Sequence, residues 1–343
     1  MRAAWWERNG AARDVLVLGQ MPTPTPAPGE VLVRMVTSGV NPSDVKFRAG
    51  RPPGFPRIVP HSDGAGVVDA VGEGVDPARV GERVWLWNGA WKRAHGTAAE
   101  YIALPANQAV LLDPNTSFDA AACFGIPALT ALHAALCDGG VSGQRVLVQG
   151  GAGGVGHYAI QFARLLGARQ VLATVSGQAK ATHALGAGAD AAINYRDGDL
   201  AARVRDLTDG HGVDRVIELD LAGNAATLPA LLAPGGFVAC YGSGRPEASL
   251  AFFPHIMAGI GYRFFIVYEL TEADRARAVG ALGAWCRAGL LQHAVAARLP
   301  LDEIVAAHEA VESGTLIGNM VVDLQYPTGH SQPWPNPPPS NVA

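Results

Sequence analysis

The sequence predicts an α/β protein in which a mostly antiparallel β domain precedes a doubly wound parallel sheet. Three observations support this prediction. The chain has 343 residues, more than one hydrophobic core usually serves, so two domains are expected. Short apolar runs broken by glycine and proline fill the first third, as in antiparallel β domains. Strands alternating with helices fill the middle, as in parallel sheets.

The elements follow this division in order. Residues 1–118 hold β-branched runs such as "GEVLVRMVTSGVNPSD" and "GAGVVDAVGEGVDPARVGERVW". Residues 119–257 pair "RVLVQG" with the helical "GVGHYAIQFARLLG", and "QVLATVS" with "AKATHALGAG". Residues 258–325, which end in the strand "GNMVVDL", are expected to return to the first domain. Residues 326–343 form a proline-rich segment, interpreted as an extended tail.

Composition excludes several classes of function. The chain is 49% hydrophobic and 16% charged, with a formal net charge of -4, which gives no electrostatic reason to expect nucleic acid. No apolar run has the length of a membrane span, and the first residues lack the pattern of a signal peptide, so we expect a cytoplasmic protein without a membrane partner. Four scattered cysteines predict buried thiols.

The stretch "RVLVQGGAGGVG" carries the first functional motif. Gly151, Gly153 and Gly156 form G-x-G-x-x-G between a strand and a helix. These glycines permit a tight turn and a close approach of the backbone to a pyrophosphate, while the helix N-terminus offers N–H groups to the anion. The motif predicts a Rossmann dinucleotide site. The alternative is an ordinary glycine-rich turn.

The end of the second strand favours NADPH as the dinucleotide. An NAD site places a carboxylate there to hold the ribose 2′-hydroxyl. This chain has Ser176 and Gly177 at that point, and Lys180 in the next helical turn. Tyr195, after the third strand, is expected to close the same pocket. The alternatives are a solvated Lys180 and a structural Tyr195.

Several motifs together resemble a known family. They are "SGVNPSD", "VPHSDGAGVVDAVGEGV", "VGERVW", "GTAAEYIALP", "GGAGGVG", "AINYR" and "GNMVVDL". In order and spacing they are similar to the zinc-independent quinone oxidoreductases of the medium-chain dehydrogenase/reductase superfamily, which include zeta-crystallin. The resemblance covers about residues 1–324.

The resemblance implies a GroES-like catalytic domain joined to the Rossmann domain, with the nicotinamide between them. Asn41 and Ser62 stand where zinc-dependent relatives carry metal ligands, and the resemblance gives both a role beside the substrate oxygen. A catalytic zinc needs three protein ligands, and this sequence has none at the expected positions, so no metal is predicted.

The resemblance also assigns cofactor contacts. The pyrophosphate would lie on the glycine turn, the adenosine phosphate beside the second and third strands, and the nicotinamide half beside the last two strands and one helix. In that order the residues are Ala152, Gly153, Gly154, Val155 and Gly156; Ser176, Lys180 and Tyr195; and Tyr241, Gly242, Ser243, Thr130, Phe265 and Ile266. Thr130 has an alternative as a helix N-terminal hydroxyl without a ligand.

Two residues depart from the family pattern. Relatives often have a substrate-facing tyrosine where this chain has Lys46, which is either a stabiliser of the substrate oxygen or a salt-bridged lysine at the domain edge. His61 falls where relatives have glycine, and it either touches substrate or satisfies a hydrogen bond at the cleft edge.

These observations favour an NADPH-dependent oxidoreductase that transfers hydride to a quinone or another conjugated carbonyl. The alternatives are a 2-alkenal or 2-enone reductase with little quinone activity, a zinc alcohol dehydrogenase, and a crystallin-like protein that holds NADPH without turnover. The resemblance implies a homodimer or homotetramer with "GSGRPEASLAFF" in the interface. Trp85, Trp87 and Trp91 are interpreted as core packing, with an aromatic wall for a planar acceptor as the alternative.

Overall fold

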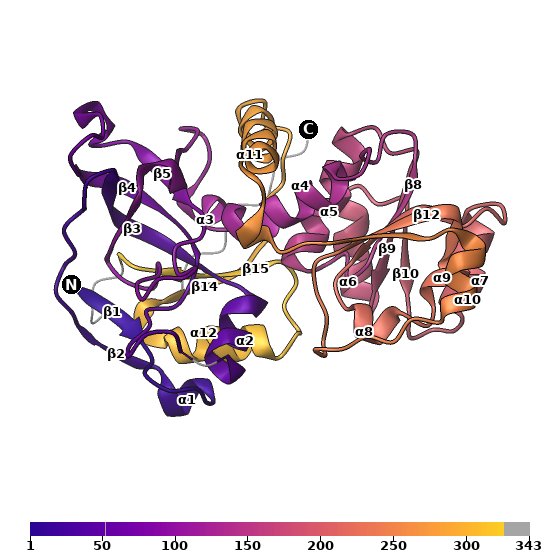
Figure 1. Ribbon diagram of the computed structural model, residues 1–343, viewed down its shortest axis with the longest axis horizontal. Coiled ribbons are helices and arrows are strands. Elements are labelled where there is room, and N and C mark those ends of the chain that lie inside the picture. The colour runs from indigo at the N-terminus through magenta and orange to yellow at the C-terminus, as the bar shows by residue number, and fades with distance from the viewer. Residues whose placement is uncertain (52, 326–343) are drawn as a thin grey trace.

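The structure is a computed structural model that describes residues 1–51 and 53–325. Its two lobes each contain one large sheet, and Figure 1 shows them side by side along the longest axis. The parallel six-stranded sheet and the separate, mainly antiparallel sheet confirm the predicted fold class. The predicted tail, residues 326–343, lies outside the described residues.

The first lobe is built on a seven-stranded sheet in the order β14-β15-β3-β4-β5-β7, with β6 paired to β3. Its pairs are antiparallel except for β14 with β15. Its strands are β3 (Glu30–Val40), β4 (Asp63–Val71), β5 (Arg83–Leu86), β6 (Tyr101–Pro105), β7 (Ala109–Leu111), β14 (Val295–Pro300) and β15 (Asn319–Asp323). A two-stranded pair, β1 (Arg2–Trp5) and β2 (Val17–Gln20), lies apart.

The second lobe has six parallel strands in the order β10-β9-β8-β11-β12-β13. This order reverses direction beside β8, which is where doubly wound sheets bind their ligands. The strands are β8 (Arg145–Val148), β9 (Gln170–Val175), β10 (Ala191–Asn194), β11 (Val213–Glu218), β12 (Leu232–Cys240) and β13 (Gly261–Phe264).

Helices cover both faces of the six-stranded sheet. Successive residues of β8 point to opposite faces of the sheet. Val146 and Val148 pack with α5 on one face, and Leu147 packs with α7 and α9 on the other. Nearly every residue of such a strand is buried, which explains why it reads as a continuous apolar run. The helices of this lobe are α4 (Leu129–Leu136), α5 (Gly154–Leu165), α6 (Gln178–Gly186), α7 (Leu200–Leu207), α8 (Leu221–Asn224), α9 (Leu228–Leu231) and α10 (Phe252–Ala258).

Other helices join or flank the lobes. A π-helical turn, Phe124–Ala128, leads into α4. The remaining α-helices are α1 (Ala12–Val15), α2 (Pro42–Gly50), α3 (Phe118–Ala121), α11 (Glu272–Arg287) and α12 (Ile304–Glu312). Short 3₁₀ turns span Pro77–Arg79, Ala106–Gln108, Val267–Glu269 and Leu301–Glu303. No helix among the described residues is long and apolar enough to cross a membrane.

The predicted return to the first domain at residue 258 is wrong for its first strand. β13 pairs with β12 in register from Phe237 with Gly261 to Cys240 with Phe264, so it closes the six-stranded sheet. The chain rejoins the first sheet only at β14 and β15. This pairing could not be predicted, since a short edge strand has the same composition in either sheet.

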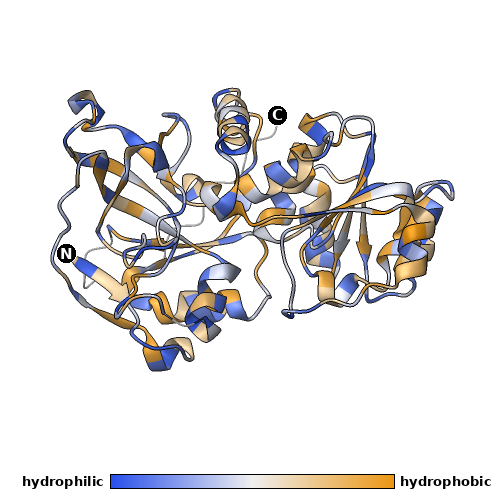
Figure 2. Ribbon diagram, viewed as in Figure 1, coloured by the Kyte–Doolittle hydropathy of each residue, from blue (hydrophilic) through white to orange (hydrophobic). Residues whose placement is uncertain are grey.

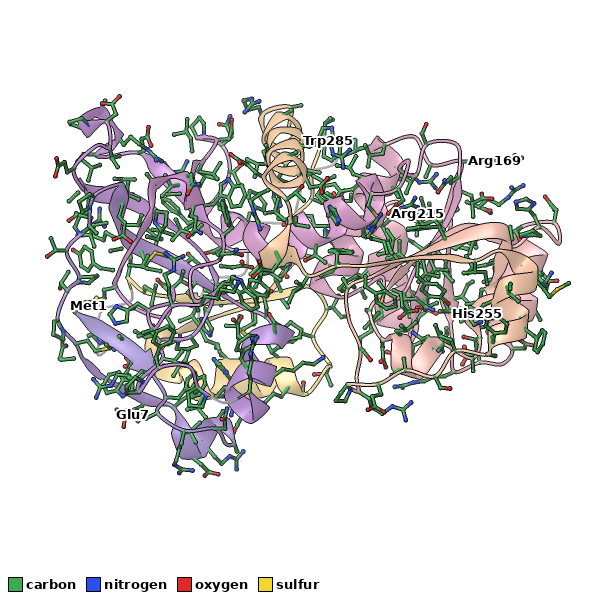
Figure 3. The ribbon with its side chains drawn as sticks, viewed as in Figure 1. Met1, Glu7, Arg169, Arg215, His255 and Trp285 are labelled. Atoms are coloured by element: carbon green, nitrogen blue, oxygen red, sulfur yellow. The ribbon has the colours of Figure 1, made fainter. Side chains whose placement is uncertain are left out.

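Side chains outside the site account for several conspicuous residues. Buried Arg215 on β11, labelled in Figure 3, donates to the backbone oxygens of Ala134, Cys137 and Asp138 and so caps the end of α4. Trp85 is buried in the core against Phe124, which agrees with its interpretation as core packing. All four cysteines are free thiols, and three of them are buried.

Candidate active site

The glycine turn leaves one open position among tightly packed ones. A Cβ on Gly156 would lie 2.2 Å from the backbone oxygen of Gly150, and one on Gly154 would lie 2.0 Å from Asn319 Oδ1. A Cβ on Gly153 would meet nothing closer than Gly150 O at 3.5 Å, and Gly153 is exposed. The turn therefore packs helix on strand at one glycine and keeps free space before the α5 N-terminus at another, as a pyrophosphate site requires.

The returning chain supports this turn from the other lobe. Gly318 N donates to Ala152 O at 2.9 Å, and Gly153 forms an isolated parallel bridge with Gly318. Asn319, the first residue of β15, packs against Gly154 and donates from Nδ2 to Ala294 O. Gly318 and Asn319 were not predicted as part of the site, because more than 150 residues separate them from the turn.

Two of the three residues predicted for the adenosine phosphate lie at the ends of neighbouring strands, and the third, Lys180, lies on α6. Ser176 follows β9 and Tyr195 follows β10, and Tyr195 N donates to Val175 O at 3.1 Å. Lys180 Nζ donates to Gly314 O at 3.2 Å. Arg196, which sequence reasoning missed, places its guanidinium 5.8 Å from the Tyr195 ring. Its signal was available, since it follows Tyr195 directly. Arg196 thus lies near the half-exposed Tyr195 ring, while Lys180 contacts the segment that follows α12.

The residues predicted for the nicotinamide half also come together. Tyr241, Gly242 and Ser243 follow β12, and Phe265 N donates to Cys240 O at 3.1 Å. The Phe265 ring lies 6.3 Å from Tyr241 and 4.5 Å from His133. Thr130, one turn before His133 on α4, is buried. Ile266 is exposed, beside this group.

Two buried carboxyl groups surround Asn41 at the start of α2. Its backbone N–H donates to Asp44 Oδ2 at 2.8 Å, and its Nδ2 donates to Asp63 Oδ2 at 2.9 Å. Burial raises the pKa of Asp44 to about 7. Burial and the nearby Asp44 charge raise the pKa of Asp63 well above its usual value. Asn41 is thus fixed in position by acids that resist ionisation.

Ser62 and Lys46 occupy different depths beside Asn41. Ser62 is buried, and its Oγ accepts from Ala90 N at 3.4 Å. Lys46 is exposed on α2, and its Nζ donates to Ser243 O at 3.3 Å, which joins the two lobes. Lys46 has no carboxylate within ion-pair distance among the described residues, so its contact is not the salt bridge of the alternative interpretation.

His61 is an interior residue and does not face the cleft edge. It is fully buried, with φ of 75°, a left-handed conformation that glycine adopts more easily. Its Nδ1 lies 2.8 Å from Ser38 Oγ and its Nε2 lies 2.9 Å from His308 Nε2. Arg48 Nε donates to His308 Nδ1, so His308 donates from Nε2 to His61, and His61 donates to Ser38. His61 is thus one link in a buried chain of hydrogen bonds from Arg48 to Ser38.

Tyr268 is the residue near α2 that sequence reasoning missed. Its hydroxyl donates to Ser43 Oγ at 3.0 Å, and its ring stacks on Trp91 with centroids 4.3 Å apart and planes at 14°. Trp91 thus packs against the segment that follows β13. Trp87 lies instead beneath the guanidinium of Arg275, 3.9 Å from its ring centre.

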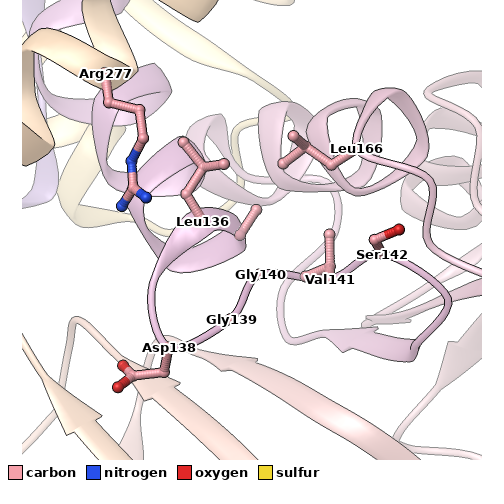
Figure 4. A pocket seen from close by; sticks show the side chains of 9 residues that line it. Leu136, Asp138, Gly139, Gly140, Val141, Ser142, Leu166 and Arg277 are labelled. Atoms are coloured by element: carbon pink, nitrogen blue, oxygen red, sulfur yellow. The ribbon is translucent and has the colours of Figure 1, made fainter.

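A surface pocket lies away from these residues. It has a volume of about 360 Å³ and lies between the ends of α4 and α5 and Arg277 of α11, as Figure 4 shows. Asp138 in its lining is paired with Arg263 at 2.7 Å, and Arg277 is paired with Asp274 at 3.0 Å. Its charges are already neutralised within the protein, and none of the predicted site residues lines it.

The side chains at positions 41 and 62 are unsuited to zinc. Positions 41 and 62 offer an amide and a hydroxyl, whereas catalytic zinc takes thiolate, imidazole or carboxylate ligands. In residues 1–51 and 53–325, no three histidine, cysteine or acidic side chains are grouped to hold a metal ion.

Comparison with known proteins places this geometry in a family. Residues 27–114 match the alcohol dehydrogenase GroES-like domain, and residues 154–282 match the zinc-binding dehydrogenase domain. Human quinone oxidoreductase is 30% identical over 335 residues, which cover 94% of this chain and 98% of that protein. The chain belongs to the zeta-crystallin-like quinone oxidoreductase family of the medium-chain dehydrogenases/reductases.

Two further family members define the range of similarity. The 2-haloacrylate reductase of a Burkholderia species is 32% identical over 326 residues, covering 90% of this chain and 95% of that protein. The solved structure of Escherichia coli quinone oxidoreductase complexed with NADPH superimposes with a TM-score of 0.85 at 26% identity, covering 94% of this chain and all of that one. The family assignment makes this chain an oxidoreductase.

Proposed function

We propose that this protein uses NADPH to reduce a quinone or another conjugated carbonyl compound, without a metal. The observation that carries the proposal is the glycine turn, whose open Gly153 precedes α5, together with Lys46 of the other lobe, which reaches Ser243 after β12. When bound, NADPH supplies the hydride. The chain's own residues bind it, orient the acceptor and hold the oxygen that gains negative charge.

The glycine turn suits the pyrophosphate because its open position, Gly153, precedes the N-terminus of α5. Lys180 and Arg196 lie at the corner where the ribose phosphate would bind, and positions 176 to 180 contain no carboxylate to repel it. Cations beside a 2′-phosphate favour NADPH over NADH. The NADPH complex of the Escherichia coli relative supports the same cofactor.

The acceptor would lie between α2 and the segment that follows β13. Asn41, Lys46 and Ser62 are proposed to steady its oxygen, with Lys46 the most accessible of the three. The raised pKa values of Asp44 and Asp63 limit negative charge beside Asn41, which favours an oxygen that is becoming an anion. The amide and hydroxyl at positions 41 and 62 support chemistry without zinc.

A second candidate is a reductase of conjugated carbon–carbon double bonds with little quinone activity. The similarity to 2-haloacrylate reductase favours it, since that name describes a substrate with such a double bond. Loss of reduced-nicotinamide absorbance with NADPH, and in parallel NADH, against quinones, 2-alkenals and saturated aldehydes separates the two.

The same assay is run before and after chelator treatment. We expect NADPH-dependent turnover of a quinone or an enone that a chelator does not change. Chelator-sensitive activity would restore the zinc alternative. Tight NADPH binding with no turnover of any acceptor would favour a non-catalytic, crystallin-like role.

We further propose that the chain forms a homodimer or homotetramer through the β13 edge of the six-stranded sheet. Helix α10 beside this edge is hydrophobic, as Figure 2 shows, and exposes Phe253 and Met257 by 74% and 83%. A second copy would cover both the free strand edge and these side chains. Light scattering of wild type and of Phe253→Asp tests this, and a monomeric wild type would refute it.

A further inference from the structure

One face of α2 is turned toward the junction of the lobes. Ser43, Lys46 and Phe47 share this face, because residues three and four apart lie together on a helix. Ser43 Oγ accepts from Tyr268 Oη, Lys46 donates to Ser243 O, and the Phe47 ring meets the edge of Trp91 at 6.0 Å. The Tyr268 hydroxyl therefore contacts the same face of α2 that carries Lys46. This face lies near the end of β12, which is expected to hold the nicotinamide.

Contacts from three segments fix the position of Tyr268. Its backbone oxygen accepts from Asn88 Nδ2 at 2.9 Å and from Arg275 Nη2 at 3.2 Å. Its ring stacks on Trp91, and Trp91 Nε1 in turn donates to Glu269 at 2.7 Å. A hydroxyl held in this way needs little reorganisation to meet a ligand, which is the condition for effective electrostatic stabilisation.

The surroundings keep this phenol protonated. Burial and the nearby carboxyl groups of Asp44 and Asp63 raise the pKa of Tyr268 above its usual value. Tyr268 is therefore a hydrogen-bond donor across the whole range in which the protein would work. Its donor bond goes to Ser43 Oγ, a neutral hydroxyl that an anionic oxygen can replace as the acceptor, because bonds to charged acceptors are stronger.

We propose that Tyr268 is a catalytic residue that donates a hydrogen bond to the carbonyl oxygen of the acceptor. It supplies from the segment after β13 the hydroxyl that α2, with Lys46 in place of tyrosine, does not carry. This inference rests on the proposed reductase function. The hydride adds to the carbon of the double bond that lies farther from the carbonyl. The π electrons of that double bond then form a new bond toward the carbonyl carbon, and the π electrons of the carbonyl move onto its oxygen. Tyr268 stabilises this oxygen and keeps its own proton, and water supplies the proton that completes the product.

The test compares two tyrosine-to-phenylalanine variants. Tyr268→Phe removes only the hydroxyl and preserves the stack on Trp91. Tyr262→Phe is the matched control, because the Tyr262 hydroxyl contacts His255 instead, 2.8 Å away on the β13 edge. We expect Tyr268→Phe to lower kcat/KM about 10- to 100-fold, mainly through kcat, with NADPH affinity unchanged. Tyr262→Phe should stay within about twofold of wild type.

Binding of 4-nitrophenolate gives a readout that does not depend on turnover. This anion imitates the developing oxyanion, and its absorbance reports binding. We expect Tyr268→Phe to bind it at least fivefold more weakly than wild type and Tyr262→Phe in the presence of NADP⁺. Lys46→Met, measured in parallel, separates a contribution of the lysine charge from that of the phenol.

The outcomes distinguish this inference from the proposed function. If wild type reduces an acceptor and Tyr268→Phe does so equally well, Tyr268 is not catalytic, and a loss confined to Lys46→Met would transfer the role to the lysine. If wild type reduces no acceptor, the proposed function fails, and 4-nitrophenolate binding then tests whether Tyr268 forms an oxyanion site. Weaker binding of 4-nitrophenolate in Tyr268→Phe alone would still establish an oxyanion site at Tyr268. Equal binding in all variants would overturn the inference.

Discussion

The glycine turn and the start of α2 are built in different ways. The turn after β8 consists of consecutive residues whose backbone does the work, and its key contact joins Gly156 to Gly150, six positions away. The α2 region is assembled from side chains that lie far apart in sequence, such as Ser43 with Tyr268 and Asn41 with Asp63. A cofactor site can thus be encoded locally, whereas the acceptor site depends on how the two lobes meet.

The largest effect is expected where the turn packs backbone against backbone. Gly156→Ala would place a methyl group 2.2 Å from Gly150 O, where both partners are backbone and cannot give way easily. We expect the free energy of unfolding to fall by about 3 kcal/mol. We also expect NADPH binding to be lost. Gly153→Ala is the matched variant, because its methyl group has space and its φ of -79° suits alanine.

Gly153→Ala should keep the wild-type melting temperature and weaken NADPH about tenfold or more, since the methyl group would occupy space meant for the pyrophosphate. Thermal melting and NADPH titration of both variants test this. If Gly153→Ala binds NADPH as wild type does, the open space in the turn is not the pyrophosphate site.

The second prediction concerns cofactor choice at the end of β9. Lys180→Glu should weaken NADPH by about 10- to 100-fold and leave NADH within about twofold, because only NADPH carries the 2′-phosphate. Arg203→Glu, the same charge change at an exposed position on α7, is the control. Cofactor titrations measure both. Equal weakening of the two cofactors in Lys180→Glu would mean that this corner does not read the phosphate.

The division between these regions also explains what sequence could predict. Strand, glycines and helix follow one another in "RVLVQGGAGGVG", and the neighbouring strands β9 and β10 follow in chain order, so the glycine turn and the strand order could be predicted. Tyr268 was missed because its partners, Ser43 and Trp91, belong to the other lobe. The β13 strand was misplaced for a different reason, because a short edge strand can pair in either sheet, and here it pairs with β12 of the same lobe. Local periodicity identifies a strand, but the partner of that strand is a long-range property.

The third prediction concerns buried His61, which should make the folded protein less stable at acidic pH. Burial lowers the pKa of His61 well below its usual value and that of His308 to about 3, so the folded chain keeps both rings neutral. Below about pH 6.5 the unfolded chain takes up protons that the folded chain refuses, and stability falls as the pH is lowered.

His61→Gly removes the contribution of His61 to this loss of stability at low pH. Glycine also suits the left-handed backbone at this position, but the variant loses the hydrogen bonds to Ser38 and His308. We expect its melting temperature, relative to wild type, to rise by several degrees between pH 7.5 and pH 5. His95→Ala, which removes an exposed histidine, should follow the wild type. A difference between His61→Gly and wild type that does not change with pH would contradict a buried neutral His61.

The smallest effect is expected at the exposed rim of the lobe junction. Glu269 accepts from Trp91 Nε1 and pairs with Lys92 at 2.7 Å, but the Lys92 side chain is 71% exposed and water screens the pair. Glu269→Gln keeps an oxygen for Trp91 and removes the charge, so its melting temperature should stay within about 1 °C of wild type. Lys92→Met should behave alike, and the double variant should equal the sum of the two. A strong, non-additive loss would show that the ion pair, and not the buried contacts of Tyr268, holds the lobes together at this point.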